Sequence, residues 1–156
     1  MVFLKNMKSM KIKLGYRVFL FAFVCMLFFY ACEDELTGDI RTAEAIPGEW
    51  RVNEESENLG TSSYQVYIGI SAEDSSKVLI SNFYQLGYDT EVIGFISGNR
   101  IELQNNQEVS LSGISSYIIK SGSGTVSSDY QNIDWQYTID DGSGNIDNVS
   151  AIYTKQ

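Results

Sequence analysis

The sequence predicts an all-β fold, an antiparallel up-and-down β-barrel of about eight strands. Apolar and polar residues alternate with a period of two in short runs from Gly48 onward, as they do in strands with one buried and one solvated face. The runs are joined by short, turn-rich connections, so strands that are neighbours in sequence are expected to pair and to close on themselves. A β-sandwich is the alternative.

The segment 131–140 is the clearest predicted strand. Its odd-numbered residues from 133 to 139 are Ile, Trp, Tyr and Ile, and its even-numbered residues from 134 to 140 are Asp, Gln, Thr and Asp. One face is therefore expected in the core and the other in water. Similar runs predict further strands that include residues 64–70, 78–80, 92–96, 101–103, 109–111, 117–120 and 149–153.

Glycine, asparagine, aspartate and serine mark the connections between these runs. Ser97-Gly98-Asn99-Arg100 predicts a tight hairpin, because Gly98 and Asn99 adopt a positive φ at little cost. Segments 72–76, 86–90, 104–107 and 141–145 are interpreted as the other turns. No helix longer than one turn is predicted after residue 31.

Residues 1–31 have the composition of a secretory signal peptide. The first 17 residues carry five basic side chains and no acidic one, and residues 18–31 are fourteen apolar residues. A basic segment followed by an apolar core of roughly 7–15 residues is typical of such signals. The apolar run is shorter than the roughly 20 residues of a membrane-spanning helix.

The end of this signal is similar to a lipobox. Phe29-Tyr30-Ala31-Cys32 resembles the site at which bacterial lipoproteins are cleaved and lipidated. The resemblance implies that Cys32 becomes the lipid-bearing N-terminus and that the protein is held at the membrane by this anchor. Ordinary cleavage that leaves Cys32 as a free thiol is the alternative.

Three acidic residues follow the predicted lipid attachment site. Glu33, Asp34 and Glu35 resemble the surface-export signal of Bacteroidota lipoproteins. The resemblance implies an outer-membrane lipoprotein exposed on the cell surface, with the periplasmic face of that membrane as the alternative. Residues 32–47 are polar and acidic without alternation, so we expect a flexible tether, followed by one domain at residues 48–156.

Charge and composition exclude several function classes. From Cys32 onward the chain has 6 basic and 20 acidic residues, which argues against nucleic acid as a partner. The chain has no histidine, and Cys25 would be removed with the signal. Ser-His-Asp or Cys-His catalysis and histidine-ligated zinc are therefore excluded. We expect no cofactor and no enzymatic activity.

The ordered runs together resemble the calycin-like or lipocalin-like barrel lipoproteins of Bacteroidota. The resemblance rests on Gly48-Glu49-Trp50, on segments 77–83 and 92–101, and on Ala151-Ile-Tyr-Thr-Lys155. It implies an eight-stranded barrel with a cup lined by side chains and no enzymatic activity. It also implies that Trp50 is a structural residue at the closed end, packed under Lys155 or Arg51.

Tyrosines beside the predicted strands are the candidate contacts for a ligand or partner. Tyr84, Tyr88 and Tyr130 fall in or next to loops, off the alternation. An exposed tyrosine offers a flat apolar face and a hydroxyl group that suit sugars, peptides and proteins. Packing at the rim of the barrel is the alternative for all three.

The acidic residues near 140 invite two further hypotheses. Asp140, Asp141, Asn145 and Asp147 form a weak candidate for a calcium site, but they lack the spacing of an EF-hand and are interpreted as a hairpin loop. Asp134 and Asp140 are candidate carboxylates for a hydrolase. They are expected on the polar outer face, where nothing would raise the pKa of a catalytic acid.

The sequence therefore predicts a lipid-anchored binding or accessory module of the cell envelope without catalytic activity. Its ligand would be a small apolar molecule in the cup, or a glycan or protein at the rim. The alternatives are a structural envelope lipoprotein whose packed barrel binds nothing small, and a carboxylate-based hydrolase.

Overall fold

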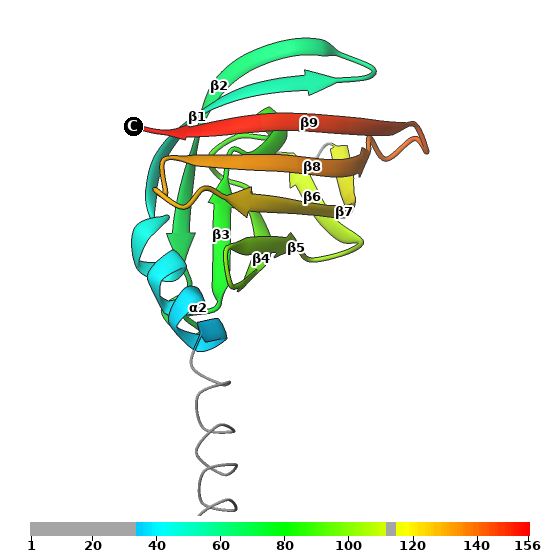
Figure 1. Cartoon of the computed structure of the whole chain (residues 1–156). Helices are drawn as coiled ribbons and strands as arrows, with labels where there is room; N and C mark the ends of the chain where they lie inside the picture. The colour runs from blue at the N-terminus through cyan, green and yellow to red at the C-terminus, as the bar shows by residue number, and fades with distance from the viewer. Residues whose placement is uncertain (1–33, 112–114) are drawn as a thin grey trace, which may run out of the picture. The chain divides into compact units, whose positions relative to one another are not determined.

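The computed structural model describes residues 34–111 and 115–156, which form a closed antiparallel barrel with one helix (Figure 1). The sheet order is β5-β4-β3-β2-β1-β9-β8-β7-β6, and pairing of β5 with β7 closes eight of the strands into a ring. The strands are β1 Gly48–Ser56, β2 Gly60–Ile70, β3 Lys77–Ser81, β4 Glu91–Ser97, β5 Arg100–Leu103, β6 Gln107–Leu111, β7 Ser115–Val126, β8 Asn132–Asp140 and β9 Ile146–Lys155.

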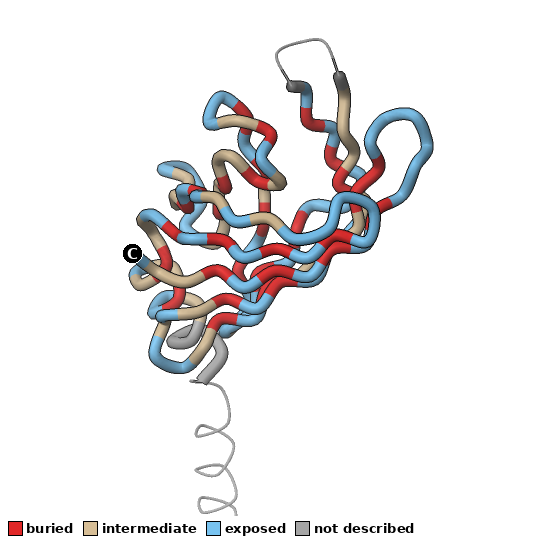
Figure 2. The backbone as a smooth tube through the Cα atoms, turned by 90° about the horizontal axis from the view of Figure 1, so that it is seen from above, coloured by how far each residue is buried: buried red, intermediate tan, exposed pale blue. Residues whose placement is uncertain are grey.

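This arrangement confirms the predicted up-and-down barrel. Every strand pairing is antiparallel, and strands that follow one another pair along the ring except where β6 intervenes between β5 and β7. Alternation along the strands is also confirmed: in β8, residues 133, 135, 137 and 139 are buried. Figure 2 shows buried and exposed residues alternating along the strands. The hairpin at 97–100 forms with Gly98 at φ 62°.

Large side chains fill the interior of the barrel. Trp50, Trp135 and Tyr153 are among the largest side chains that are almost completely buried. Phe83 comes from the short 3-10 helix η1 (Phe83–Gln85), and its ring centroid lies 4.6 Å from that of Tyr137. The remaining large, fully buried residues are mostly isoleucines: Ile46, Ile68, Ile80, Ile101, Ile119, Ile133 and Ile139.

The predicted flexible tether is wrong for most of its length, because α2 occupies Asp34–Ala45. Thr42 and Ile46, four residues apart, have exposed fractions of 1% and 0%. Thr42 Oγ1 donates a hydrogen bond of 2.8 Å to Gly98 O, and Asp39 accepts one from the Gly98 amide. Figure 1 shows α2 at one end of the barrel. Few of its residues are apolar, so only these tertiary contacts account for the helix.

The helix α2 has 12 residues, so the prediction of no helix beyond one turn is also wrong. Among the residues that the structure describes, none of the helices has both the length and the apolar character needed to cross a membrane.

A side-chain amide joins β6 to the barrel. Ile93 in β4 donates its backbone amide to Gln107 Oε1 at 2.8 Å, and Gln107 Nε2 donates to Ile93 O at 3.3 Å. Gln107 is buried, and its amide bonds Ile93 just beyond the last β4–β5 pair, Gly94 with Leu103, while the other edge of β4 stays paired with β3. Buried polar groups of β4 are thereby satisfied at the junction.

Two glycines in β7 make room for the aromatic core. A Cβ on Gly124 would lie 2.7 Å from the Trp135 ring and 2.8 Å from Ile133 Cγ2. A Cβ on Gly122 would lie 2.5 Å from Tyr137 Cβ. Any larger residue at these positions would force the β8 side chains away from the barrel axis.

We therefore expect Gly124→Ala to destabilise the domain by about 1–3 kcal/mol, because the packed Trp135 ring must shift. Urea unfolding followed by tryptophan fluorescence measures the change. Thr125→Val, which alters the exposed neighbour of Gly124, is the control and should change stability by less than about 0.5 kcal/mol. Equal stabilities of Gly124→Ala and the wild type would contradict this account.

Candidate functional site

One end of the barrel contains all the buried charged side chains among the described residues. These are Glu54, Asp140 and Asp147, with exposed fractions of 5%, 7% and 4%. Glu54 is near the end of β1, Asp140 ends β8 and Asp147 is near the start of β9. Because these strands are antiparallel, the three positions meet at the same end. This acidic end is opposite the end that holds Trp50.

The closed end has the arrangement that the family resemblance implied. Trp50 is fully buried, its Nε1 donates a hydrogen bond of 2.9 Å to Ile46 O, and Lys155 Nζ lies 5.7 Å from the centroid of its ring. Lys155 also donates to the carbonyl oxygen of Ala45. Lys155 is thus the cation over Trp50, whereas Arg51 is on the exposed face of β1.

Glu54 is surrounded by tyrosines. Tyr64 Oη donates a hydrogen bond of 2.5 Å to Glu54 Oε2, and Tyr137 Oη donates to the same oxygen. Ser62 Oγ is 3.4 Å from the other carboxylate oxygen. Tyr153 is fully buried nearby, and its hydroxyl has no hydrogen-bond partner of normal geometry among the described residues. The hydroxyls of Ser62, Tyr64 and Tyr137 replace the water that the Glu54 carboxylate loses on burial.

The environment of Glu54 strongly favours neutral tyrosines. Burial raises the pKa of Tyr64, Tyr137 and Tyr153 well above the ordinary value of 10.0, and the nearby Glu54 raises each pKa further. A phenolate in this position would be both desolvated and close to a carboxylate. The folded protein therefore holds these three protons more tightly than the unfolded chain does.

These shifts predict alkaline unfolding. Because the folded-state pKa values are raised, the stabilisation is complete below about pH 10, the unfolded tyrosine value, and decreases as the pH rises above it. We expect Tyr64, Tyr137 and Tyr153 to ionise only as circular dichroism reports unfolding, with phenolate absorbance as the measure. Tyr88→Phe, which changes an exposed tyrosine, should leave this transition unchanged. Ionisation of all tyrosines near pH 10 in a folded domain would contradict the prediction.

Asp147 forms a second buried cluster on the same side. Its Oδ2 accepts hydrogen bonds of 2.6 Å from both Ser56 Oγ and Tyr84 Oη, and its Oδ1 accepts one of 3.2 Å from the Asn58 amide. Burial alone would raise the pKa of Asp147, but the hydrogen bonds from Ser56 and Tyr84 outweigh it and hold this pKa below the ordinary value. Asp147 is thus a carboxylate at neutral pH.

A small cleft opens beside Asp147. It has a volume of about 140 Å³. Two of its walls are the rings of Tyr84 and Tyr117, whose centroids are 6.3 Å apart at an interplanar angle of 60°. Tyr84 is held in the cleft by η1, where its φ is 51°. The lining residues are Asn58, Leu59, Tyr84, Tyr117, Ile139, Asp141, Asn145 and Asp147.

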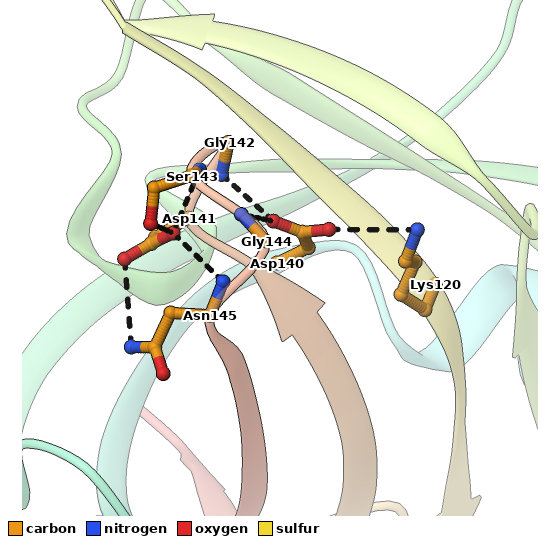
Figure 3. A network of polar contacts seen from close by, with 7 residues as sticks. All are labelled: Lys120, Asp140, Asp141, Gly142, Ser143, Gly144 and Asn145. Carbon is orange, nitrogen blue, oxygen red and sulfur yellow. Dashed lines mark hydrogen bonds and ion pairs between the residues drawn. The ribbon is translucent and has the colours of Figure 1, made fainter.

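The β8–β9 loop uses its carboxylates to hold its own backbone (Figure 3). Asp140 Oδ1 accepts hydrogen bonds from the amides of Gly142 and Gly144 at 2.9 and 3.1 Å, and Asp140 Oδ2 lies 3.5 Å from Lys120 Nζ. Asp141 accepts hydrogen bonds from Ser143 and Asn145, and the side-chain bond from Ser143 is the main reason that the pKa of Asp141 is lowered.

These contacts show that Asp140 is not on the solvated outer face as expected, and they also concern the weak calcium candidate. Asp140 is buried, not solvated on the outer face, because the loop folds back over its carboxylate; Asp134 is exposed as expected. For calcium, Asp147 points to Ser56 and Tyr84 instead of joining Asp140, Asp141 and Asn145. Across residues 34–111 and 115–156, no group of three or more acidic or cysteine side chains could hold a metal ion.

The structure separates the three tyrosines that the sequence singled out. Of these, only Tyr84 lines the cleft. Tyr88 is 59% exposed and donates a hydrogen bond of 3.2 Å to Gln65 O. Tyr130 is half-buried against the core at φ 57°. Cys32 and Glu33 lie outside the described residues, and Asp34 and Glu35 begin α2.

Sequence reasoning missed Glu54, Tyr117 and Tyr137 as site residues, and it considered Asp147 only as a weak calcium ligand. The signal was present in the alternation: Glu54 continues the inward series of Trp50 and Val52, and Asp147 precedes Val149 in the inward series of β9. An acidic residue that alternates in step with the buried apolar residues of a strand is itself expected to be buried. Such a carboxylate must accept hydrogen bonds from nearby groups, so it marks a polar cluster inside the barrel.

A second depression crosses the outer face of the sheet. It has a volume of about 880 Å³ and runs over β2, β1, β9, β8, β7 and β5. Its lining includes short polar residues such as Ser63, Thr125 and Ser150, with Arg100 at one side. The depression is wide and polar, unlike the small acidic and aromatic cleft.

The fold and the site together define a closed β-barrel with an apolar, helix-covered end and an acidic, tyrosine-rich end. No protein-family model and no curated protein matches the chain. Among solved structures, the redesigned β-barrel mFAP1 bound to DFHBI is similar at 17% identity and a TM-score of 0.48, over 74% of this chain and 99% of that chain.

A second solved structure is a Bacteroides fragilis NCTC 9343 protein provisionally assigned to the outer membrane. Its identity is 14% and its TM-score 0.45, over 75% of this chain and 53% of that chain. The redesigned barrel b11L5F_LGL is similar at 14% identity and a TM-score of 0.47, over 74% of this chain and 96% of that one. At such values these similarities carry no argument about ligand or location.

Proposed function

We propose that this protein is a lipid-anchored binding module of the cell envelope, of the calycin-like Bacteroidota lipoprotein type, with its ligand site at the acidic end of the barrel. The observation that carries the proposal is the contrast between a barrel interior filled by Trp50, Trp135 and Tyr153 and an open cleft at the rim. A small apolar ligand in the cup would have to displace these side chains, so the rim is favoured.

A non-catalytic role is supported by the state of the carboxylates. The lowered pKa of Asp147 makes it a poor proton donor. Asp140 is bound by the Gly142 and Gly144 amides, and Asp134 is exposed on the outer face. With no histidine in the chain, we propose binding and not hydrolysis. A purely structural envelope protein is the competing proposal, and the open cleft counts against it.

Anchoring through Cys32 is tested by lipid labelling. Cells fed labelled palmitate should incorporate the label into the wild-type protein, and Cys32→Ala should abolish incorporation, because the lipids are attached at this residue. Cys25→Ala is the matched control and should keep the label, since Cys25 lies in the part predicted to be removed. Label that persists in Cys32→Ala refutes the anchor.

Export to the cell surface is tested with an external protease. On intact cells the wild-type protein should be degraded, whereas replacement of Glu33, Asp34 and Glu35 together by alanine should protect it by retaining it on the periplasmic face. Replacement of Glu55 and Glu57 in the folded domain removes a similar charge and should leave the protein accessible. Protection of the wild type would place it on the periplasmic face instead.

A further inference from the structure

The cleft at the acidic end combines aromatic, apolar and acidic walls. Tyr84 and Tyr117 present aromatic rings, Ile139 and Leu59 present apolar groups, and Asp141 and Asp147 present carboxylates. Leu59 is 73% exposed at the lip. Liquid water occupies roughly 30 Å³ per molecule, so a cleft of about 140 Å³ has room for a group of only a few heavy atoms.

Two of the three buried carboxylates at this end, Glu54 and Asp147, form no ion pair with a lysine or arginine in the part of the chain that the structure describes. Among the described residues, ion pairs join Lys120 to Asp140 and Arg100 to Glu102, and neither involves Glu54 or Asp147. Glu54 is nonetheless close enough to raise the pKa of Tyr84, together with Asp147. The rings of Tyr84 and Tyr137 are also in contact, with centroids 6.2 Å apart. The cleft therefore lies in the field of two buried acidic side chains.

We infer that this cleft binds the ammonium group of a small alkylamine. The inference rests on the proposed binding role of the acidic end and adds the chemical class of the ligand. An ammonium group would supply the counter-charge that Asp147 lacks among the described residues. Its methyl or methylene groups would contact the faces of Tyr84 and Tyr117, which attract cations through the quadrupoles of their rings.

Other ligand classes fit these walls less well. An anion would be repelled by Asp141 and Asp147. A metal ion requires several oxygen ligands around one point, and Asp141 Oδ1 already accepts bonds from both Ser143 and Asn145. An uncharged apolar ligand would leave the carboxylate without a counter-charge. The side-chain oxygen of Asn145 can accept a hydrogen bond from a primary amine, and the nearby Asp147 carboxylate attracts its charge.

The experiment is titration calorimetry of the full chain with choline and with n-butylammonium. The control ligand is the uncharged isostere of choline in which carbon replaces nitrogen. We expect saturable binding in roughly the millimolar range for at least one amine, and at least about ten-fold weaker binding of the isostere. Preference for choline would indicate a quaternary ligand, and preference for n-butylammonium a primary amine.

Three variants assign the binding to the cleft. Asp147→Asn should weaken amine binding about ten-fold, and Tyr117→Leu about five-fold through loss of the cation–π contact. Asp134→Asn removes an exposed carboxylate away from the cleft and should leave affinity unchanged. Tyr117 is only half-buried, so its variant tests the site even if Asp147→Asn fails to fold.

Three results would overturn the inference: no saturable binding of either amine by the folded wild-type chain, equal binding of the uncharged isostere, or equal weakening by Asp134→Asn and Asp147→Asn. A different result would contradict the proposed function: a wild-type protein that incorporates no labelled palmitate. If the wild-type protein incorporates the lipid label but binds neither amine, the ammonium inference is wrong and the proposed lipid-anchored role is not affected.

Discussion

Closure of the barrel through β7 is the constraint on which the rest of the structure depends. The first part of β7 pairs with β6 and its last part with β5, with a register irregularity between Ile119 and Ser121. Gly122 and Gly124 follow that irregularity, and their missing side chains admit Trp135 and Tyr137 to the lumen. The space left by these two glycines is therefore filled by aromatic side chains, and the interior of the closed barrel is tightly packed.

The filled middle makes the two ends different in chemistry. At one end Trp50 donates a hydrogen bond to Ile46 O just after α2, and Lys155 donates to the Ala45 carbonyl oxygen and lies over the Trp50 ring. At the other end Glu54 and Asp147 form no ion pair within the described residues, and their carboxylates accept hydrogen bonds from tyrosine and serine hydroxyls. Buried carboxylates are costly unless such bonds are made. The acidic end therefore combines charge, aromatic surface and an opening, which the rest of the barrel does not.

Individual residues show why some features of the site were predictable and others were not. Alternation along β1 predicts that Trp50 and Val52 face the interior of the barrel. The same alternation predicts that Glu54, two residues further on, also faces the interior. The partners of Glu54 are separated from it by 10 and 83 residues. Long-range pairings of this kind depend on strand register, which alternation alone leaves open.

The sequence by itself determined the strand pattern, the antiparallel class and the excess of acidic residues, because each of these is local or compositional. Only the tertiary structure decided that residues 34–45 are helical, since Thr42 and Ile46 are buried against segments distant in sequence. It also decided that Tyr84, Tyr117 and Asp147 share one cleft while Tyr88 and Tyr130 do not line it. A site made from five separate segments exists only once the ring has closed.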